Sequence, residues 1–141
     1  SPELFRAARL RDPLKSKQLQ KGLQELGEEG AIQVFENLAT GALLLGAVGV
    51  LQFEVVAQRL QTEYKVDAIF EPADINTARW LTFPDDLTRR NFEREQQHRM
   101  AKDVDGNLVY LASTRYNLDV TREKWTKVGF HASREHGQVL A

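Results

Sequence analysis

The sequence predicts an α+β fold: a ferredoxin-like split β-α-β unit, with an antiparallel sheet and helices on one face, extended by a second small α/β unit. In residues 1–71, short apolar segments alternate with two amphipathic stretches in the order β-α-β-β-α-β, which is the order of the split β-α-β motif. Turns that contain Gly or Pro separate most of these segments. After residue 71 the pattern becomes less regular, so we predict two domains, residues 1–71 and 72–141, joined at residues 71–76.

The first half begins with an apolar segment at residues 4–10, which predicts a strand. The Asp12-Pro13 pair then predicts a helix start, because Asp is a favoured N-cap and Pro is tolerated in the first turn of a helix. Leucines recur along the next stretch at the spacing of one helical face, at Leu19, Leu23 and Leu26.

The rest of the first half completes the motif. Residues 31–35 and 42–45 are expected to form two strands, joined by a turn at residues 37–41. Apolar residues repeat at three- and four-residue spacing over residues 50–64, which predicts a second helix. Residues 66–70 alternate in polarity and predict the fourth strand.

The second half carries weaker signals, and no internal repeat is evident. We expect a strand at 78–83, a charged helix at 85–102, a turn at Asp105-Gly106, a strand at 108–112, a short helix capped by Ser113 or Thr114 and ending near Trp125, and a last strand at 128–132. Trp80 and Trp125 are expected to pack in a core or between the halves rather than to stack on bases, because each flanks an apolar segment.

Composition limits the function classes. The 141 residues carry 19 basic and 20 acidic side chains, so the chain as a whole is not a strongly basic nucleic-acid binder. No cysteine is present, which excludes disulfides and thiolate metal sites and fits a cytoplasmic protein. No apolar run reaches the roughly 20 residues that span a bilayer, so no membrane partner is expected. The chain begins Ser-Pro without Met, and we interpret it as a piece of a longer protein.

Catalytic, cofactor and metal sites are not expected in this chain. The Gly46-x-x-Gly49 turn lacks the Lys and the third glycine of a phosphate loop, so a tight strand-to-helix turn is the favoured interpretation. The histidines do not have the spacing of metal ligands; they are His98, His131 and His136. The carboxylates that could form acid–base pairs have structural interpretations as well; they are Glu28, Glu29, Asp85, Asp86 and Glu54, the last expected to pair with a basic residue from another element.

Basic residues are the open functional question. Six positive charges lie in residues 6–21, opposed there by Asp12 alone; they are Arg6, Arg9, Arg11, Lys15, Lys17 and Lys21. Such a patch could contact RNA phosphates, or it could be the solvated face of a helix. Three further candidates are Arg79, Arg115 and Arg134.

Residues 44–70 resemble the third-domain segment of elongation factor G and its relatives, in which a glycine-rich turn leads into a helix and then a strand. The matching residues here are Gly46, Gly49, Glu54, Val55, Val56, Arg59, Leu60, Tyr64 and Val66. Residues 48–53 replace the Gly-Glu-Leu-His run of the elongation factors, which points to the GTPase branch of the bacterial peptide chain release factors. Four segments are similar to the C-terminal, third domain of that branch: residues 12–30, 45–59, 78–80 and 134–136.

The resemblance implies a non-catalytic domain that docks on the ribosome and relays a signal in translation termination, where the parent GTPase promotes dissociation of class-one release factors. The implied partners are RNA and protein of the small ribosomal subunit, and the GTP-binding and β-barrel domains of the parent. GTP and magnesium would belong to the parent, because this chain has no G-x-x-x-x-G-K-[ST] phosphate loop. The alternative is a free-standing ferredoxin-like module that binds RNA or protein.

Overall fold

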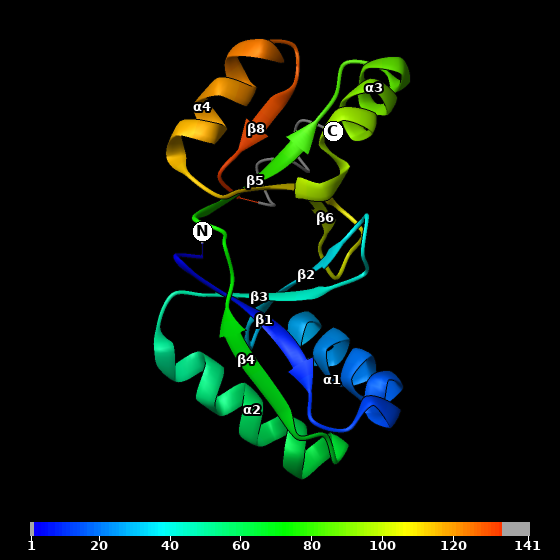
Figure 1. Ribbon diagram of the computed structural model, residues 1–141, viewed down its shortest axis with the longest axis vertical. Helices are drawn as coiled ribbons and strands as arrows, with labels where there is room; N and C mark the ends of the chain where they lie inside the picture. Colours follow the sequence, from blue (N-terminus) through cyan, green and yellow to red (C-terminus); the bar gives the residue numbers. More distant parts are fainter. Residues whose placement is uncertain (1, 134–141) are drawn as a thin grey trace.

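The structure is a computed structural model that describes residues 2–133, and within them it contains one eight-stranded sheet and four α-helices (Figure 1). In chain order the elements are β1 (Leu4–Leu10), η1 (Pro13–Lys15), α1 (Ser16–Glu29), β2 (Gln33–Asn37), β3 (Leu43–Ala47), α2 (Val50–Tyr64), β4 (Ala68–Pro72), β5 (Thr77–Thr82), α3 (Asp86–Gln96), η2 (Gln97–Arg99), β6 (Met100–Lys102), β7 (Leu108–Ala112), α4 (Arg115–Lys124) and β8 (Gly129–His131). The sheet order is β4-β1-β3-β2-β6-β7-β5-β8, with every pair antiparallel.

The first half has the predicted split β-α-β topology. Strands β4, β1, β3 and β2 lie in that order, and α1 and α2 cover the same face of them. The core under these helices is built from the stripe of α1, the inward face of α2 and alternate strand residues, among them Leu23, Val34, Leu45, Phe53 and Leu60. The predicted α+β class is therefore confirmed.

The second half repeats the topology of the first, so the expectation that the chain holds no repeat is wrong. The order β5-α3-β6-β7-α4-β8 is again β-α-β-β-α-β, and its strands lie as β6-β7-β5-β8, the first-half order in reverse. Elements β3 and β7 are 65 positions apart, as Ala47 and Ala112 show. The turns before them both contain a glycine with positive φ, Gly41 and Gly106. Few side chains are identical between the halves, which is why inspection of the sequence missed the repeat.

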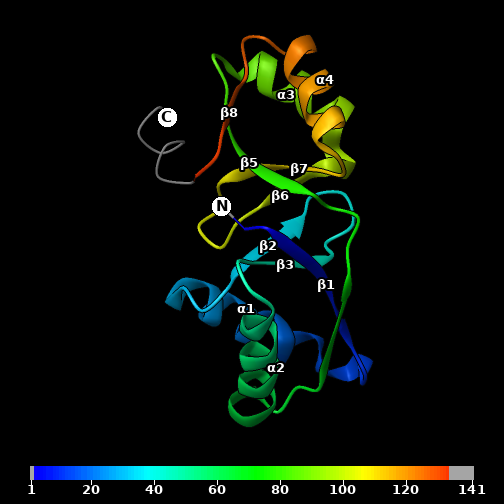
Figure 2. The same cartoon turned by 90° about the vertical axis from the view of Figure 1, so that its left-hand side faces the viewer.

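The two halves join through equivalent strands. β2 pairs with β6, with Glu36 opposite Lys102 and Asn37 opposite Ala101. An antiparallel pair of equivalent strands is the pairing that a two-fold axis generates. The sheet faces that carry no helices then pack on each other, so that α1 and α2 lie at one end of the molecule and α3 and α4 at the other (Figures 1 and 2).

The central core between the halves contains Trp80, as predicted. Its ring lies 5.9 Å from that of Phe35, between centroids, and its Nε1 donates to Oδ2 of Asp103 at 3.0 Å. Both side chains are less than a tenth exposed. The remaining buried members of this cluster are Phe5, Leu44, Ala78, Ala101, Val109 and Leu111.

The helix predicted for residues 85–102 is too long. It ends at Gln96, and residues 100–102 form strand β6 instead. Met100 and Ala101 are fully buried, and β6 lies between β2 and β7, which supply the hydrogen bonds that an extended buried segment needs. The sequence contained one indication that the helix ends early: no apolar residue lies between Phe92 and Met100 to continue its apolar face.

Strands β2 and β4 begin later than predicted, because the residues before them close helices. Gly30 has φ of 86°, and the amide of Ala31 donates back to the carbonyl of Leu26 at 3.0 Å. At the end of α2 the left-handed residue is Lys65, and the amide of Val66 donates to Leu60 at 3.0 Å. Such C-cap bonds satisfy the last carbonyls of a helix and delay the strand. These two strands therefore span 33–37 and 68–72, and β3 spans 43–47.

Candidate nucleic-acid interface

The three arginines of the predicted basic patch on and after β1 already have partners. The Arg6 guanidinium carbon lies 4.5 Å from the centroid of the Phe53 ring, on the face that the helices cover. Arg9 forms an ion pair with Glu71 at 2.6 Å, and Arg11 pairs with Asp67 at 3.0 Å. Exposed pairs of this kind add little stability, but they neutralise the positive charge of this edge.

The lysines that follow lie in a different environment. Lys15 ends η1, whereas Lys17 and Lys21 on α1 line a cavity of about 540 Å³. Its other wall includes Lys102, at the end of β6 in the second half. We call the cavity with these three side chains, Lys17, Lys21 and Lys102, the lysine groove. All three are exposed, and none of them forms an ion pair within residues 2–133.

Spacing on α1 explains the concentration of charge. Lys17 and Lys21 are one turn apart, so both project from the same side of the helix. Like charges at this spacing destabilise an isolated helix by about 0.2–0.5 kcal/mol. An anion held between the ammonium groups would relieve this repulsion.

The acidic residues of the groove do not cancel the lysines. Asp103 is buried, and its carboxylate accepts hydrogen bonds from Trp80 Nε1, at 3.0 Å, and from the amides of Asp105 and Asn107, at 3.0 and 2.9 Å. Glu36 is the second carboxylate of the lining, and it forms no ion pair among the described residues. Internal hydrogen bonds already engage the carboxylate of Asp103, so Glu36 is the one carboxylate of the lining that remains to balance the three ammonium groups.

The groove is a feature of both halves. Gln24 on α1 donates through Nε2 to the carbonyl of Val104, in the β6–β7 turn, at 2.9 Å. Gly27 allows the close approach, because a Cβ there would lie 2.6 Å from Cγ1 of Val104. Neither contact could be inferred from the sequence, since it joins residues about 80 positions apart.

Two of the remaining candidates form a second basic cluster. Arg79 on β5 donates to Thr77 Oγ1 at 2.7 Å and to the carbonyl of Ala78 at 2.8 Å. Burial, together with the nearby positive charges of Arg115 and Arg122, lowers the pKa of Arg79. Arg122 was missed in the sequence, although it follows Arg115 by seven residues on α4 and thus shares its side of the helix. Arg134, the last candidate, and His136 lie outside the described residues.

The Gly46-x-x-Gly49 segment is a close-packed turn, as favoured above. Gly49 is the N-cap of α2, and Oε1 of Gln52 accepts from the amides of Val48 and Gly49 at 2.8 and 3.1 Å. The amides of Val48 and Gly49 are therefore already hydrogen-bonded within the turn. A Cβ on Gly46 would lie 2.8 Å from Cβ of Pro2, which requires glycine here.

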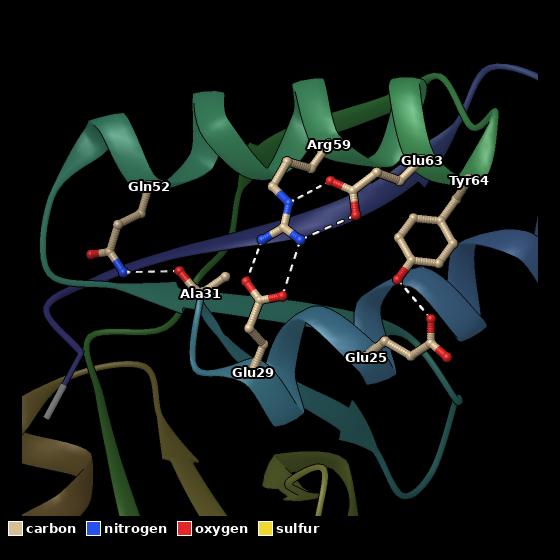
Figure 3. A network of polar contacts seen from close by, with 7 residues as sticks. All are labelled: Glu25, Glu29, Ala31, Gln52, Arg59, Glu63 and Tyr64. Atoms are coloured by element: carbon tan, nitrogen blue, oxygen red, sulfur yellow. Dashed lines mark hydrogen bonds and ion pairs between the residues drawn. The ribbon is translucent and has the colours of Figure 1, made fainter.

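Glu54 does not pair with a basic residue of another element, contrary to expectation; it is exposed, and no ion pair of it occurs in the described part of the chain. Arg59 makes that link instead (Figure 3). Its Nη2 donates to Glu29 on α1 at 3.0 Å and its Nε to Glu63 at 2.6 Å. The hydrogen bonds to Arg59 lower the pKa of both carboxyls and raise that of Arg59.

The same contact recurs in the second half. Lys124 occupies the position equivalent to Arg59 and pairs with Glu95 near the end of α3. Trp125 Nε1 also donates to Glu95, at 2.7 Å, and both bonds lower the pKa of that carboxyl. Helix–helix clamps at equivalent positions indicate a structural role for Arg59 rather than a catalytic one.

Neither a metal-binding cluster nor a membrane span occurs in residues 2–133. There, no group of three or more His, Cys, Asp or Glu side chains could hold a metal ion. None of the helices in this part combines the length and the apolar character that crossing a membrane needs.

Comparison with known proteins identifies the family. Residues 1–122 match the sequence model described as "Class II release factor RF3, C-terminal domain". The chain is 79% identical over 141 residues to Peptide chain release factor 3 of Aromatoleum aromaticum, covering 100% of this chain and 26% of that protein. A solved crystal structure of the Thermus thermophilus protein ttk003000868 matches 73% of this chain and 16% of its own, with 21% identity and a TM-score of 0.45. The chain thus spans about a quarter of the curated relative that it matches, and it belongs to the family of class II release factor RF3 C-terminal domains.

Proposed function

We propose that this chain is the non-catalytic, ribosome-docking and signal-relay domain of a GTPase release factor that promotes dissociation of class-one release factors after peptide release. Family membership and the 79% identity to Peptide chain release factor 3 support the role in translation termination. The GTP-binding and β-barrel domains, with GTP and magnesium, would belong to the rest of the parent protein, in the cytoplasm.

The lysine groove is the observation that carries the docking proposal. Ammonium groups that form no ion pair within the described residues are suited to bind backbone phosphates of ribosomal RNA on the small subunit. Lys17 and Lys21 belong to the patch predicted from the sequence, and Lys102 adds a charge from the other half. The arginine cluster at Arg79 and Arg115 is a secondary candidate contact.

The relay part of the proposal follows from where the groove lies. Its two walls come from α1 and from the β6–β7 turn, which belong to different halves of the sheet. A phosphate bound to both walls would hold the halves in one arrangement. Binding energy would thereby be coupled to the relative position of the halves, and through them to the parent's other domains.

The test is ribosome sedimentation of the full-length parent with a GTP analogue across a salt series. Changing Lys17→Gln and Lys21→Gln together should weaken binding and lower the slope of log K against log salt by about 1.5–2, because each lost phosphate contact removes one released counterion. The matched control removes two lysines outside the groove, Lys65→Gln and Lys127→Gln, and should leave the slope unchanged. An unchanged slope in the groove variant would reject the assignment.

The rival, a free-standing RNA- or protein-binding module, makes a different prediction in the same assay. It requires the isolated 141-residue chain to bind ribosomal RNA with the affinity of the full-length parent. The docking-domain proposal predicts weaker binding by the isolated chain, because a GTP-dependent arrangement of the parent's domains is then missing.

A further inference from the structure

An exposed apolar stripe marks the first half of α2. Val48, Leu51 and Val55 are 66%, 72% and 52% exposed. Spacings of three and four residues align them along one side of the helix and the turn before it. Single exposed apolar residues are ordinary on protein surfaces, but a contiguous group typically marks an interaction site. We call these three residues the α2 apolar patch.

The patch is not part of the domain's own core. The buried residues of α2 are Phe53, Val56 and Leu60, which at about 100° per residue point to the opposite side of the helix. Further along the outward side, the stripe continues with polar residues, Gln58 and Thr62. The apolar character is therefore confined to the end of α2 that lies next to β3.

The N-terminal end of the described chain lies beside the patch. The amide of Glu3 donates to the carbonyl of Ala47 at 3.0 Å, immediately before Val48. Pro2 is buried, and its Cβ lies 2.8 Å from the position that a Cβ on Gly46 would occupy. Residues 2 and 3, where the described part of the chain begins, therefore lie against the connection that leads from β3 into α2.

We infer that the α2 apolar patch is the docking surface for the part of the parent chain that precedes this domain. The inference rests on the proposed function in one respect, the membership of this chain in a longer release factor. The matching family is a C-terminal domain, and this chain covers 26% of its relative, so most of the relative's length lies ahead of it in sequence. A segment tethered beside an apolar surface meets it at a high effective concentration, so a small patch is enough for stable contact.

The repeat supplies an internal control. Tyr116 and Val120 on α4 occupy the positions equivalent to Leu51 and Val55, and they are 74% and 45% exposed. Ser113 replaces Val48, so the second stripe is shorter. Helix α4 lies at the other end of the molecule from α2 (Figure 1), and the backbone hydrogen bond of Glu3 is made to Ala47, just before α2. The preceding segment should cover the α2 stripe and leave the α4 stripe open.

The test is thiol labelling in the full-length parent, read at peptide level by mass spectrometry. This segment has no cysteine of its own, so Leu51→Cys and Val120→Cys each introduce one reporter thiol here. In the free parent, the thiol at position 51 should react with a maleimide about tenfold or more slowly than that at position 120, because only the former is protected from solvent. Equal rates would overturn the inference.

Two other outcomes would overturn it in favour of a different occupant. Protection of position 51 that appears only when ribosomes are added would assign the patch to the ribosome. Protection that increases with protein concentration would assign it to a second copy of the chain. Ribosome sedimentation of the same unlabelled variants reports on the proposed function separately, so a failure of docking within the parent is distinguishable from a failure of ribosome binding.

Discussion

Replacing Phe92 by alanine should destabilise the second half of the molecule severely. Phe92 is fully buried and is the one buried residue of α3, so its ring is the apolar anchor of this helix. Four aromatic rings surround it at centroid distances of 5.2–6.0 Å; they belong to Phe83, Tyr110, Trp125 and Phe130.

The expected magnitude follows from this environment. Truncating a buried Phe to Ala costs about 3–5 kcal/mol, through lost transfer free energy and the cavity left behind. The upper part of that range applies, because the surrounding rings are rigid and cannot collapse into the space. For a chain of this size the loss corresponds to a fall in Tm of roughly 10–20 °C.

The assay is urea unfolding followed by circular dichroism, with Leu87→Ala on the same helix as the control. Leu87 is 60% exposed, so its replacement should change the free energy of unfolding by less than about 0.5 kcal/mol. A loss below about 1 kcal/mol for Phe92→Ala would refute the reasoning, since α3 would then be held by other contacts.

The same variant tests the proposed division into residues 1–71 and 72–141. If the halves are separate domains, amide hydrogen exchange in Phe92→Ala should accelerate in residues 77–131 and stay slow in α1 and α2, whose core lies almost wholly in the first half. Acceleration throughout the chain would contradict the division and would show that the shared central core unfolds with both halves.

Two further predictions concern the polar contacts. Arg59 lowers the pKa of Glu29, so this pair contributes stability above the usual glutamate pKa of 4.5 and loses it as the pH falls through the lowered value. The difference in free energy of unfolding between the wild type and Arg59→Met should therefore shrink between about pH 7 and pH 3; a constant difference would exclude the linkage. Asp103→Ala should cost about 1–3 kcal/mol in urea unfolding, because the indole N–H of Trp80 and the turn amides lose their acceptor. The tryptophan emission of that variant should shift to longer wavelength, because Trp80 becomes more exposed to water. An unchanged spectrum would mean that another acceptor replaces the carboxylate.

Local sequence patterns determined much of the secondary structure. The strand at residues 4–10, the helix at 50–64 and the strand at 108–112 have the bounds predicted from periodicity and turns. These elements succeed because each carries its own apolar period and ends at a Gly, an Asp or a cap. The family was also recognisable, since segments such as residues 45–59 hold their similarity without reference to the fold.

Other features depend on residues that are distant in the sequence, and only the tertiary structure determines them. β6 is a strand because β2 and β7 flank it, although we predicted that residues 100–102 end the preceding helix. Within the predicted basic patch, Glu71 and Asp67 neutralise Arg9 and Arg11, because these carboxylates of β4 and the turn before it lie beside β1 and its end. The lysines of the patch form no ion pair in the described part of the chain. Lys102 joins Lys17 and Lys21 solely through the pairing of the two halves. Periodicity is a local property of the chain, so it can be seen in the sequence. Charge pairing and burial depend on which distant segments meet in space, so they are known only once the tertiary structure is known.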